Sequence, residues 1–312
     1  MSVDVTAAAS EVPGRRSASQ AWRRLRSDSS AVVGAVLIVV FLVVAVAAPV
    51  ITAIAGTDPY TYHLDALTES GSPRGTAGGI SGAHWFGVEP LTGRDLFAIV
   101  VYGARTSFLI GLTATVVATL LGVAVGVTAG YFGGWYDRIV SRVIDVLFGF
   151  PALIFMIALG VIAPSWIPRP LLIVAVIAFF GWPRPARVIR AQTLSLKQRN
   201  FVLASTAMGS GPTHVVARQL LPNLVPTVMV FVTITIPTSI GVEAALSFLG
   251  VGVPPPTPSW GRSIGDAIDW VQTDPAYLVF PGMALFLITL AFNLFGDALR
   301  DALDTRSRGL RS

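Results

Sequence analysis

The feature that most constrains this chain is a set of five long segments that contain no charged residue. They cover 29–57, 106–136, 146–168, 219–242 and 275–296. Each is long enough for the roughly 20 residues with which a helix crosses a bilayer. Only 12% of the 312 residues are charged and the mean hydropathy is +0.70, values that exclude an ordinary water-soluble fold. The sequence therefore predicts an all-α, polytopic membrane protein.

The charges at the ends of these segments delimit the expected helices. A further span is expected between Arg169 and Arg184, two arginines separated only by uncharged residues. It is short, and it reaches full length only if Trp166 and Ile167 join it or the arginines snorkel. Without it, the two chain ends would lie on opposite sides of the membrane. The six predicted spans are 31–54, 106–130, 146–163, 170–184, 226–248 and 276–297.

Lysine and arginine are distributed unevenly over the predicted loops. If the N-terminus is inside, five of the 22 basic residues fall outside the membrane, which leaves 17 on the inner side. Such an excess is the positive-inside distribution of membrane proteins, and it predicts that both termini are cytoplasmic. The same distribution accounts for the net charge of +5, so a nucleic-acid-binding domain is not needed to explain it. The five outer residues are Arg74, Arg94, Arg105, Arg169 and Arg262.

The predicted spans divide the chain into five parts. They are a cytoplasmic tail over 1–30, a first span over 31–54, an extracytoplasmic loop over 55–105, a five-helix core over 106–297 and a cytoplasmic tail over 298–312. A cleaved signal peptide is the alternative for the first span, because Ala45 and Ala47 resemble a cleavage site. The basic arm of about 30 residues before it is long for a signal peptide, which favours a retained span.

The inner segment 185–225 is too long for a turn and too short for a catalytic domain. Its sequence predicts a helix over 201–208 that is capped by Gly209, then a second helix over 213–221 that stops at Pro222. DNA-binding helix-turn-helix units have a similar spacing, but this pair is tied at both ends to membrane spans. We therefore expect a docking element for a cytoplasmic protein, which would convert a push into movement of the fifth span.

Several glycines and prolines lie within the predicted spans. Gly122, Gly126 and Gly130 recur every four residues on the second span, a pattern that permits close approach of another helix. That helix could belong to this chain or to another subunit. Pro151 and Pro237 are predicted kinks, which would suit either gating or a static bend; Pro281 in the last span has the same interpretation.

Glu243 is a single carboxylate within the otherwise apolar fifth span. At about 1.5 Å per residue it lies roughly 26 Å along the helix from Pro226, near the outer interface. We expect it to cap or pair there, and a buried functional carboxylate is the alternative. Glu243, Pro237 and Phe248 are the candidates for a gate or for the lining of a pore.

Motifs for catalysis are missing from the sequence. Lys197 is the only lysine, so a G-x-x-x-x-G-K-[ST] nucleotide loop cannot be formed. His63, His84 and His214 are scattered without metal-ligand spacing, the chain has no cysteine, and no G-x-S-x-G elbow appears. The sequence predicts a chain without its own ATPase, cofactor or metal. An intramembrane hydrolase is the alternative from another class, and it would need a nucleophile and a base in one membrane layer.

Several motifs, taken together, resemble the second permease subunit of dipeptide/oligopeptide/nickel-type ABC importers, and the resemblance runs from about residue 20 to 308. It implies the type I importer permease fold in a bacterial inner membrane. It also implies a homologous second permease, a cytoplasmic ATPase that holds ATP and magnesium, and an extracytoplasmic binding protein. Peptides are the implied solute, while nickel and glutathione importers share the pattern. The motifs are Gly87-Val88-Glu89, Gly93-Arg94-Asp95, Tyr102-Gly103-Ala104-Arg105, the run 130–135, the run 242–250, the run 255–261 and Ala291-Phe292-Asn293.

The resemblance also assigns roles to individual residues. The family's EAA loop corresponds to 200–222, but Leu203 stands where the family usually has glutamate. The residues implied to couple to the ATPase are Ala204, Ser205, Gly209, Arg218, Leu221 and Pro222. The residues implied to contact the binding protein are Arg94, Asp95 and Trp260.

Overall fold

The computed structural model describes residues 22–303, and within this range it contains helices and loops but no strand. The predicted all-α class is confirmed. The main helices are α2 (Ser29–Ala55), α3 (Leu96–Phe132), α4 (Gly134–Gly149), α5 (Ala152–Ile162), α6 (Arg169–Gly181), α7 (Pro183–Lys197), α8 (Asn200–Ala207), α9 (Pro212–His214), α10 (Leu221–Phe248), α11 (Trp260–Asp266) and α12 (Pro275–Leu303). Three short helical segments complete the list: η1 (Leu64–Ala66), η2 (Val215–Leu220) and η3 (Ile268–Trp270).

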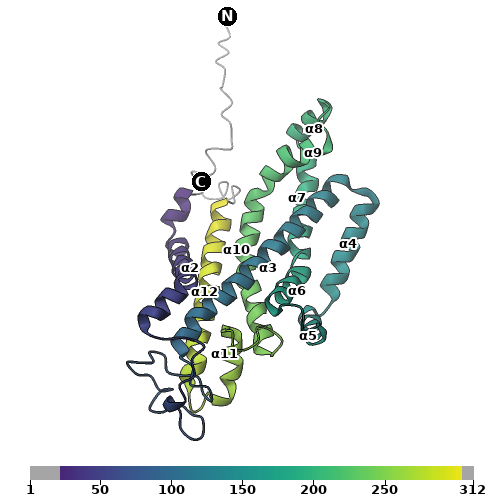
Figure 1. The fold of residues 1–312 in the computed structure, drawn as a ribbon. Helices are drawn as coiled ribbons and strands as arrows, with labels where there is room; N and C mark the ends of the chain where they lie inside the picture. The colour runs from purple at the N-terminus through teal and green to yellow at the C-terminus, as the bar shows by residue number, and fades with distance from the viewer. Residues whose placement is uncertain (1–21, 304–312) are drawn as a thin grey trace, which may run out of the picture.

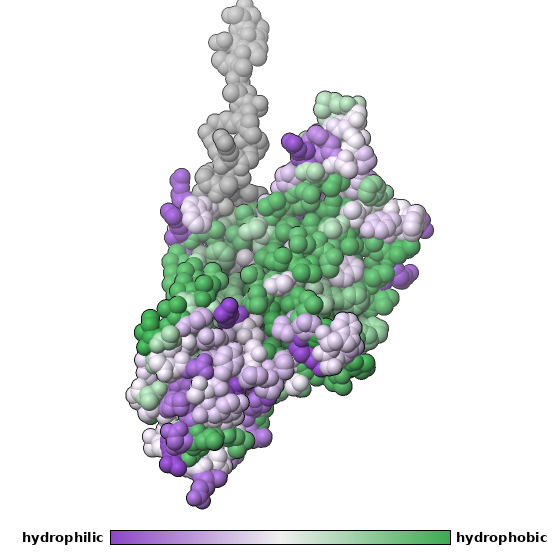
Figure 2. Space-filling view, in the orientation of Figure 1, coloured by the Kyte–Doolittle hydropathy of each residue, from purple (hydrophilic) through white to green (hydrophobic). Residues whose placement is uncertain are grey.

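The long helices run up and down through one apolar layer. Five helices of the described range are long and apolar enough to cross a membrane, and the bent pair α4 and α5 makes a sixth if it counts as one span. This agrees with the six predicted spans. Figure 1 shows that the start of α2 and the end of α12 lie toward the same end of the molecule as α8 and α9. Figure 2 shows a broad apolar band between two more polar ends.

The second span begins earlier than predicted. It starts at Leu96 rather than at residue 106, because Asp95 caps it and accepts a hydrogen bond from Ala98 N at 2.8 Å. Arg105, which set the predicted boundary, lies exposed on the side of the helix. One charge on an exposed face does not end a helix, so the long loop stops at residue 95.

The third span is broken rather than straight. α4 and α5 meet at an angle of 84°, so the prediction of one helix over 146–163 is wrong. Phe150 is extended at φ −84° and ψ 137°, as expected for a residue that precedes a proline. Pro151 is therefore the cause of the break, whereas Pro237 and Pro281 lie inside the continuous helices α10 and α12.

The fourth and fifth spans extend beyond their predicted inner ends. The fourth continues through α7 to Lys197, and the fifth forms one helical run from Pro212 to Phe248. Pro222 does not stop this run, which corrects the prediction. A π-helical turn, η2, precedes Pro222 and gives room to a ring that lacks an N–H and crowds the preceding turn.

The chain ends also differ from the prediction. α2 includes residues 29 and 30, and α12 continues to Leu303, past the predicted end at 297. Residues 22–27 of the predicted tail are also helical, whereas 1–21 and 304–312 lie outside the described residues.

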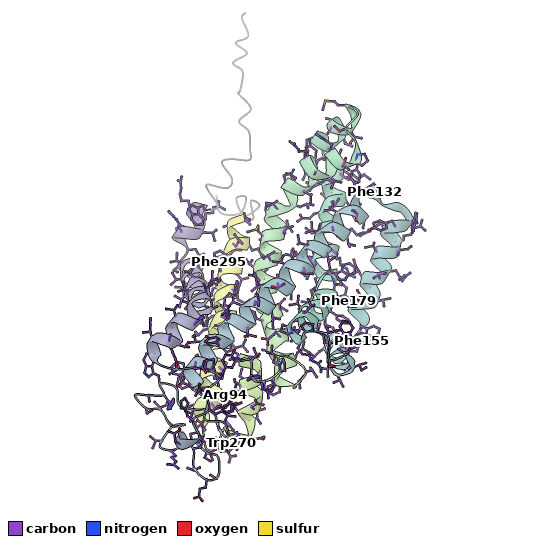
Figure 3. All side chains as sticks on the ribbon, in the orientation of Figure 1. Arg94, Phe132, Phe155, Phe179, Trp270 and Phe295 are labelled. Atoms are coloured by element: carbon purple, nitrogen blue, oxygen red, sulfur yellow. The ribbon has the colours of Figure 1, made fainter. Side chains whose placement is uncertain are left out.

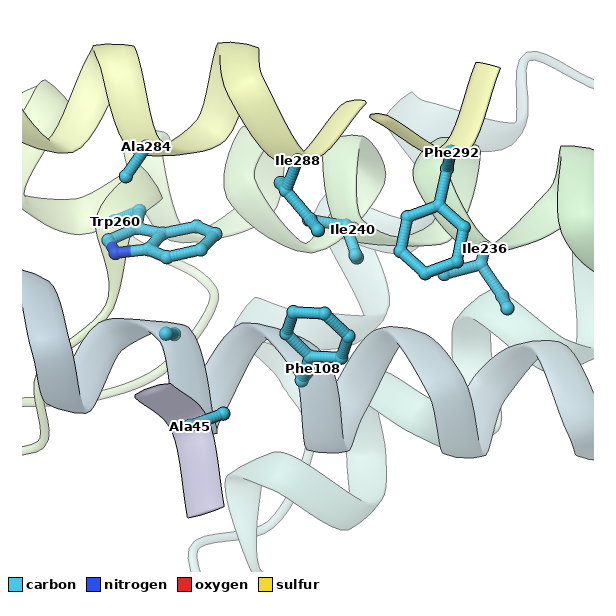
Figure 4. Close-up of a cluster of buried hydrophobic side chains, with 9 residues drawn as sticks. Ala45, Phe108, Ile236, Ile240, Trp260, Ala284, Ile288 and Phe292 are labelled. Carbon is cyan, nitrogen blue, oxygen red and sulfur yellow. The ribbon is translucent and has the colours of Figure 1, made fainter. Parts of the chain in front are cut away.

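Glycines bring α3 against its neighbours within the chain. A Cβ on Gly126 would meet Ala186 O at 2.6 Å, and Gly122 and Gly130 approach α7 equally closely. Of the two interpretations of this glycine series, packing within one chain is therefore the one that the structure supports. A second buried cluster joins α2, α3, α10, α11 and α12, and Figure 4 shows Trp260, Phe108, Ile240 and Ile288 at its centre.

Candidate functional site

A helical tip, residues 199–214, projects from one end of the molecule (Figure 1). Its first helix, α8, ends in a Schellman motif. Gly209 has φ +85°, Gly209 N donates to Thr206 O at 2.9 Å and Ser210 N donates to Ser205 O at 3.1 Å. Because only glycine adopts this conformation without strain, the predicted cap at Gly209 is confirmed.

The tip is fastened to the long helices by its inner face. Val202 is buried against Val215 and Leu220, which belong to the start of the fifth span. Ser205 is also buried, and its hydroxyl donates to Ser210 at 2.9 Å, so this predicted coupling residue shapes the turn instead of offering a surface. A force on α8 would thus reach η2 and α10 through packed side chains.

A second set of contacts joins α7 to the neighbouring spans. Lys197 Nζ donates to Tyr131 O at 2.6 Å, at the end of α3. Thr227 of α10 donates to Gln192 of α7 at 2.9 Å. Arg190 of α7 forms an ion pair with Asp137 of α4. These bonds make α3, α4, α7 and α10 one connected unit beneath the tip.

The outer face of the tip is apolar and exposed. The exposed fractions of Met208, Leu203 and Phe201 are 80%, 54% and 42%. The tip contains no acidic residue, and its basic residues are Arg199 and one histidine. An apolar patch on a projection outside the apolar band is typical of a protein contact. The other predicted coupling residues, Ala204, Gly209, Arg218, Leu221 and Pro222, are exposed on the tip or just beyond it.

At the opposite end, two loops form a cap, residues 57–95 and 250–274. Figure 3 places Arg94 and Trp270 there, at the end of the molecule away from Phe132. Arg94 and Glu89 are 7% and 4% exposed. Arg94 Nε donates to Glu89 Oε2 at 2.7 Å, and Arg94 Nη2 donates to Glu89 Oε1. Arg94 Nη1 donates to the carbonyl oxygen of Pro256. Tyr277 Oη donates to Glu89 Oε1 at 2.7 Å.

This pair has a clear electrostatic consequence. Burial alone would raise the pKa of Glu89, but the hydrogen bonds and charge of Arg94 outweigh burial and hold that pKa below its usual value. The carboxylate of Glu89 in turn raises the pKa of Arg94 against the effect of burial. Both groups are therefore ionised at neutral pH, and they join the loop before α3 to the loop after α10.

The three residues predicted to contact a binding protein are all buried in the cap. Asp95 is 0% exposed, caps α3 and contacts His84 Nδ1 at 2.8 Å. Trp260 is also 0% exposed, and its Nε1 donates to Val100 O at 2.8 Å. Arg94 is held by Glu89 as described. In the isolated chain all three side chains therefore bond within the cap, although Arg94 also lines a cleft on it, and contact with a binding protein stays a prediction.

Glu243 is buried inside the chain, near the end of α10 that adjoins the cap. Its carboxylate is 0% exposed and accepts three hydroxyl hydrogen bonds. Ser107 of α3 donates at 3.0 Å, Ser247 of α10 at 2.8 Å and Ser259 of the cap at 3.1 Å. Within residues 22–303 it forms no ion pair. The expected ion pair is therefore not found among the described residues, and the carboxylate is buried, as the alternative required; a functional role for it stays a prediction.

The three candidates for a gate or pore lining differ in their exposure. Glu243 and Pro237 are buried against the chain's own helices and line no surface of it. Phe248 is 40% exposed at the end of α10, so it is the one of the three that faces outward. Sequence reasoning missed Ser107, Ser259 and Tyr277, because a lone hydroxyl carries no pattern. The segments that hold Ser259 and Glu89 were recognised as motifs, and this was the available signal.

Comparison with known proteins gives concordant results over most of the chain. The family described as binding-protein-dependent transport system inner membrane component matches residues 122–309. The N-terminal transmembrane domain of oligopeptide transport permease C matches residues 18–70.

Curated relatives match over nearly the whole length. A glutathione transport system permease protein GsiD of Shigella flexneri is 41% identical over 92% of this chain and 90% of the relative. The GsiD proteins of an Escherichia coli O6 strain and of Shigella boydii are each 39% identical over the same shares.

Proposed function

This chain belongs to the family of binding-protein-dependent transport system inner membrane components and is a permease subunit of an ABC importer, and from that premise we propose how it works. Together with a homologous second permease it forms the translocation path. The ATPase that powers the importer is a separate partner, which holds ATP and magnesium and engages the tip. A substrate-binding protein delivers the solute to the cap.

The tip faces the cytoplasm in this proposal. Support comes from the charge distribution, because 17 of the 22 basic residues remain inside when the cap is placed outside. The start of α2 and the end of α12 lie toward the tip (Figure 1), which supports the proposal that both termini are cytoplasmic.

The single observation that carries the coupling role is the exposed apolar face of the tip above a firmly attached inner face. Met208 offers its side chain to a partner, while Val202 transmits displacement to Val215 and Leu220. ATP-driven closure of the ATPase would shift α8 and, with it, α10 and α7. Helix shifts of this kind are a common means of switching access.

The proposed solute is peptide-like, with glutathione as the first compound to test. Two observations support this choice: the match of residues 18–70 to an oligopeptide permease domain, and the name of the GsiD relatives. Glutathione is itself a tripeptide, so both observations indicate one chemical class.

Reconstitution tests the proposal directly. Proteoliposomes that contain this chain, its second permease and the ATPase should accumulate radiolabelled glutathione or a dipeptide only with ATP and the loaded binding protein. Uptake without ATP would contradict the importer, and peptide cleavage by the purified chain alone would instead support the hydrolase alternative.

Met208→Asp tests the docking surface. A buried charge at a protein contact is costly, so we expect less ATPase to copurify and at least a tenfold loss of uptake. Because Met208 is 80% exposed, the thermal stability of the isolated chain should not change. Leu64→Asp, at a cap residue that is 66% exposed, is the matched control and should leave ATPase copurification unchanged.

A further inference from the structure

A small pocket lies where four segments of the cap end of the molecule meet. It has a volume of about 250 Å³ and lies between the end of α5, the start of α6, the loop after α10 and the helix α11. Its charged lining residues are Arg169 and Arg262, and no acidic residue lines it. Glycines 160, 250 and 252 and Pro255 make up much of the remaining wall.

The two arginines have capacity for a further partner. Arg169 donates one bond to Gly160 O and forms no ion pair with any residue between 22 and 303. Arg262 contacts Asp266 at 3.2 Å, and both side chains are partly exposed. Such a pair is weak, since water competes for both charges. Two guanidinium groups line one pocket whose wall has no carboxylate, and an anion bound there would be attracted by both charges.

The size and position of the pocket restrict the ligand. Pockets that enclose a whole drug-sized ligand measure about 300–1,000 Å³, so this one suits a single anionic group of a larger molecule. Its rim is open, because Val161 is 69% exposed and Gly250, Pro254 and Pro255 are exposed. The pocket directly follows Phe248 and Leu249, which are exposed at the end of α10.

A second cleft adjoins the pocket and carries acidic groups that the pocket lacks. It shares Pro255 and Arg262 with the pocket and is also lined by Arg94, Glu89, Asp266 and Asp269. Glu89 pairs with Arg94 and Asp266 with Arg262, whereas Asp269 is exposed and has no ion pair among residues 22–303. A molecule with separated positive and negative groups, such as a peptide, would find the two arginines in the pocket and the carboxylate of Asp269 in the adjoining cleft.

We propose that the pocket between Arg169 and Arg262 is an anion site that takes a carboxylate or phosphate group at the outer mouth of the translocation path. This inference rests on the proposed function. Paired arginines suit such a ligand, because the planar guanidinium matches the geometry of both groups. A carboxylate would belong to the incoming peptide-like solute, and a phosphate would belong to the headgroup of an anionic lipid.

The test uses the complete transporter in nanodiscs of phosphatidylcholine, without the binding protein. Equilibrium dialysis with radiolabelled glutathione measures the solute arm, and glutathione diethyl ester serves as the probe without free carboxylates. Arg169→Gln and Arg262→Gln should each weaken glutathione binding about tenfold, the typical loss of one charged hydrogen bond. The diester should bind weakly to all variants. In the lipid arm, native mass spectrometry of complexes in phosphatidylglycerol nanodiscs should show fewer retained lipids in the same variants.

Three controls separate the site from a folding effect. Arg105→Gln removes an exposed outer arginine that does not line the pocket, and it should bind like wild type. Arg169→Lys keeps the charge and should retain part of the affinity. Asp266→Asn breaks the ion pair but releases Arg262, so glutathione binding should stay equal or become tighter, whereas a structural role of the pair would weaken it.

The anion site would be overturned if the two glutamine variants bound glutathione as tightly as wild type does and also retained as much phosphatidylglycerol. Loss of lipid retention alone would assign the site to lipid phosphate, and loss of glutathione binding alone would assign it to the solute carboxylate. Uptake by the wild-type importer is measured separately, so a failed proposed function remains distinguishable from a failed pocket.

Discussion

The tip and the cap both lie outside the apolar layer, yet they are built in different ways. In the tip, Met208 is 80% exposed and the polar bonds are short-range turns. In the cap, Arg94 is 7% exposed, and its guanidinium donates to the carbonyl of Pro256, which lies 162 positions away in the sequence. The tip therefore keeps an apolar surface exposed, as the proposed docking requires, whereas the cap uses its strongest polar groups to hold itself together.

The difference predicts separate consequences of substitution. Changes in the cap should lower the stability of the chain, and changes in the tip should lower coupling while stability is preserved.

Arg94→Gln should be the most damaging change in the cap. It leaves the Glu89 carboxylate buried without its cation, and breaking a buried pair in this way costs about 3–5 kcal/mol. Thermal unfolding of the detergent-solubilised chain measures the loss. Arg105→Gln, at an exposed arginine, is the control and should change the melting temperature little. Equal melting temperatures for the two variants would show that the buried pair of Arg94 and Glu89 does not hold the cap together.

Glu243→Leu should cause the second-largest loss of stability. Three buried serine hydroxyls lose their acceptor, and unsatisfied polar groups cost about 1–3 kcal/mol each when they find no new partner. We expect a total near 3 kcal/mol, because some hydroxyls can turn to helix carbonyls. Glu243→Gln keeps an acceptor oxygen and should cost about 1 kcal/mol. A Leu variant as stable as the Gln variant would show that the hydrogen bonds contribute little.

Acid should weaken the cap by a smaller amount. The pKa of Glu89 is lowered by folding, so its contribution to stability is complete above the unfolded-state pKa of about 4.3 and declines as pH falls through the lower folded value. A melting curve measured from pH 7 downward should therefore fall more steeply for wild type than for Glu89→Gln, which starts lower. Parallel curves would contradict this contribution of Glu89.

Gly209→Val should have the smallest effect on stability and a specific effect on transport. A β-branched residue at φ +85° is strained by about 1–2 kcal/mol, and a Cβ there meets no neighbour within 4 Å. We expect the variant to enter the membrane and bind ATPase, but to hydrolyse ATP without matching uptake. Gly211→Val, at an exposed glycine with negative φ, is the control. Wild-type uptake by the Gly209 variant would exclude the coupling role.

Local chemistry explains which predictions from the sequence were correct. Uncharged runs and the placement of arginines identified the spans, because each depends only on how a segment meets lipid or water. Gly209 was recognised as a cap for the same reason, since its backbone conformation is a local requirement. The failures at Arg105 and Pro222 arose because neither a single exposed charge nor one proline is sufficient to end a helix that tertiary packing supports.

The membrane class, the candidate spans, the glycine cap of the tip and the family could thus be predicted from the sequence alone. Only the tertiary structure decided that Arg94, Asp95 and Trp260 are buried, that the glycines of α3 contact α7, and that Glu243 meets Ser107, which is 136 residues away. The physical reason is that partition into a membrane depends on the composition of one segment. Burial and hydrogen bonding depend on which distant segment is brought alongside, and a lone serine or arginine does not record that partner.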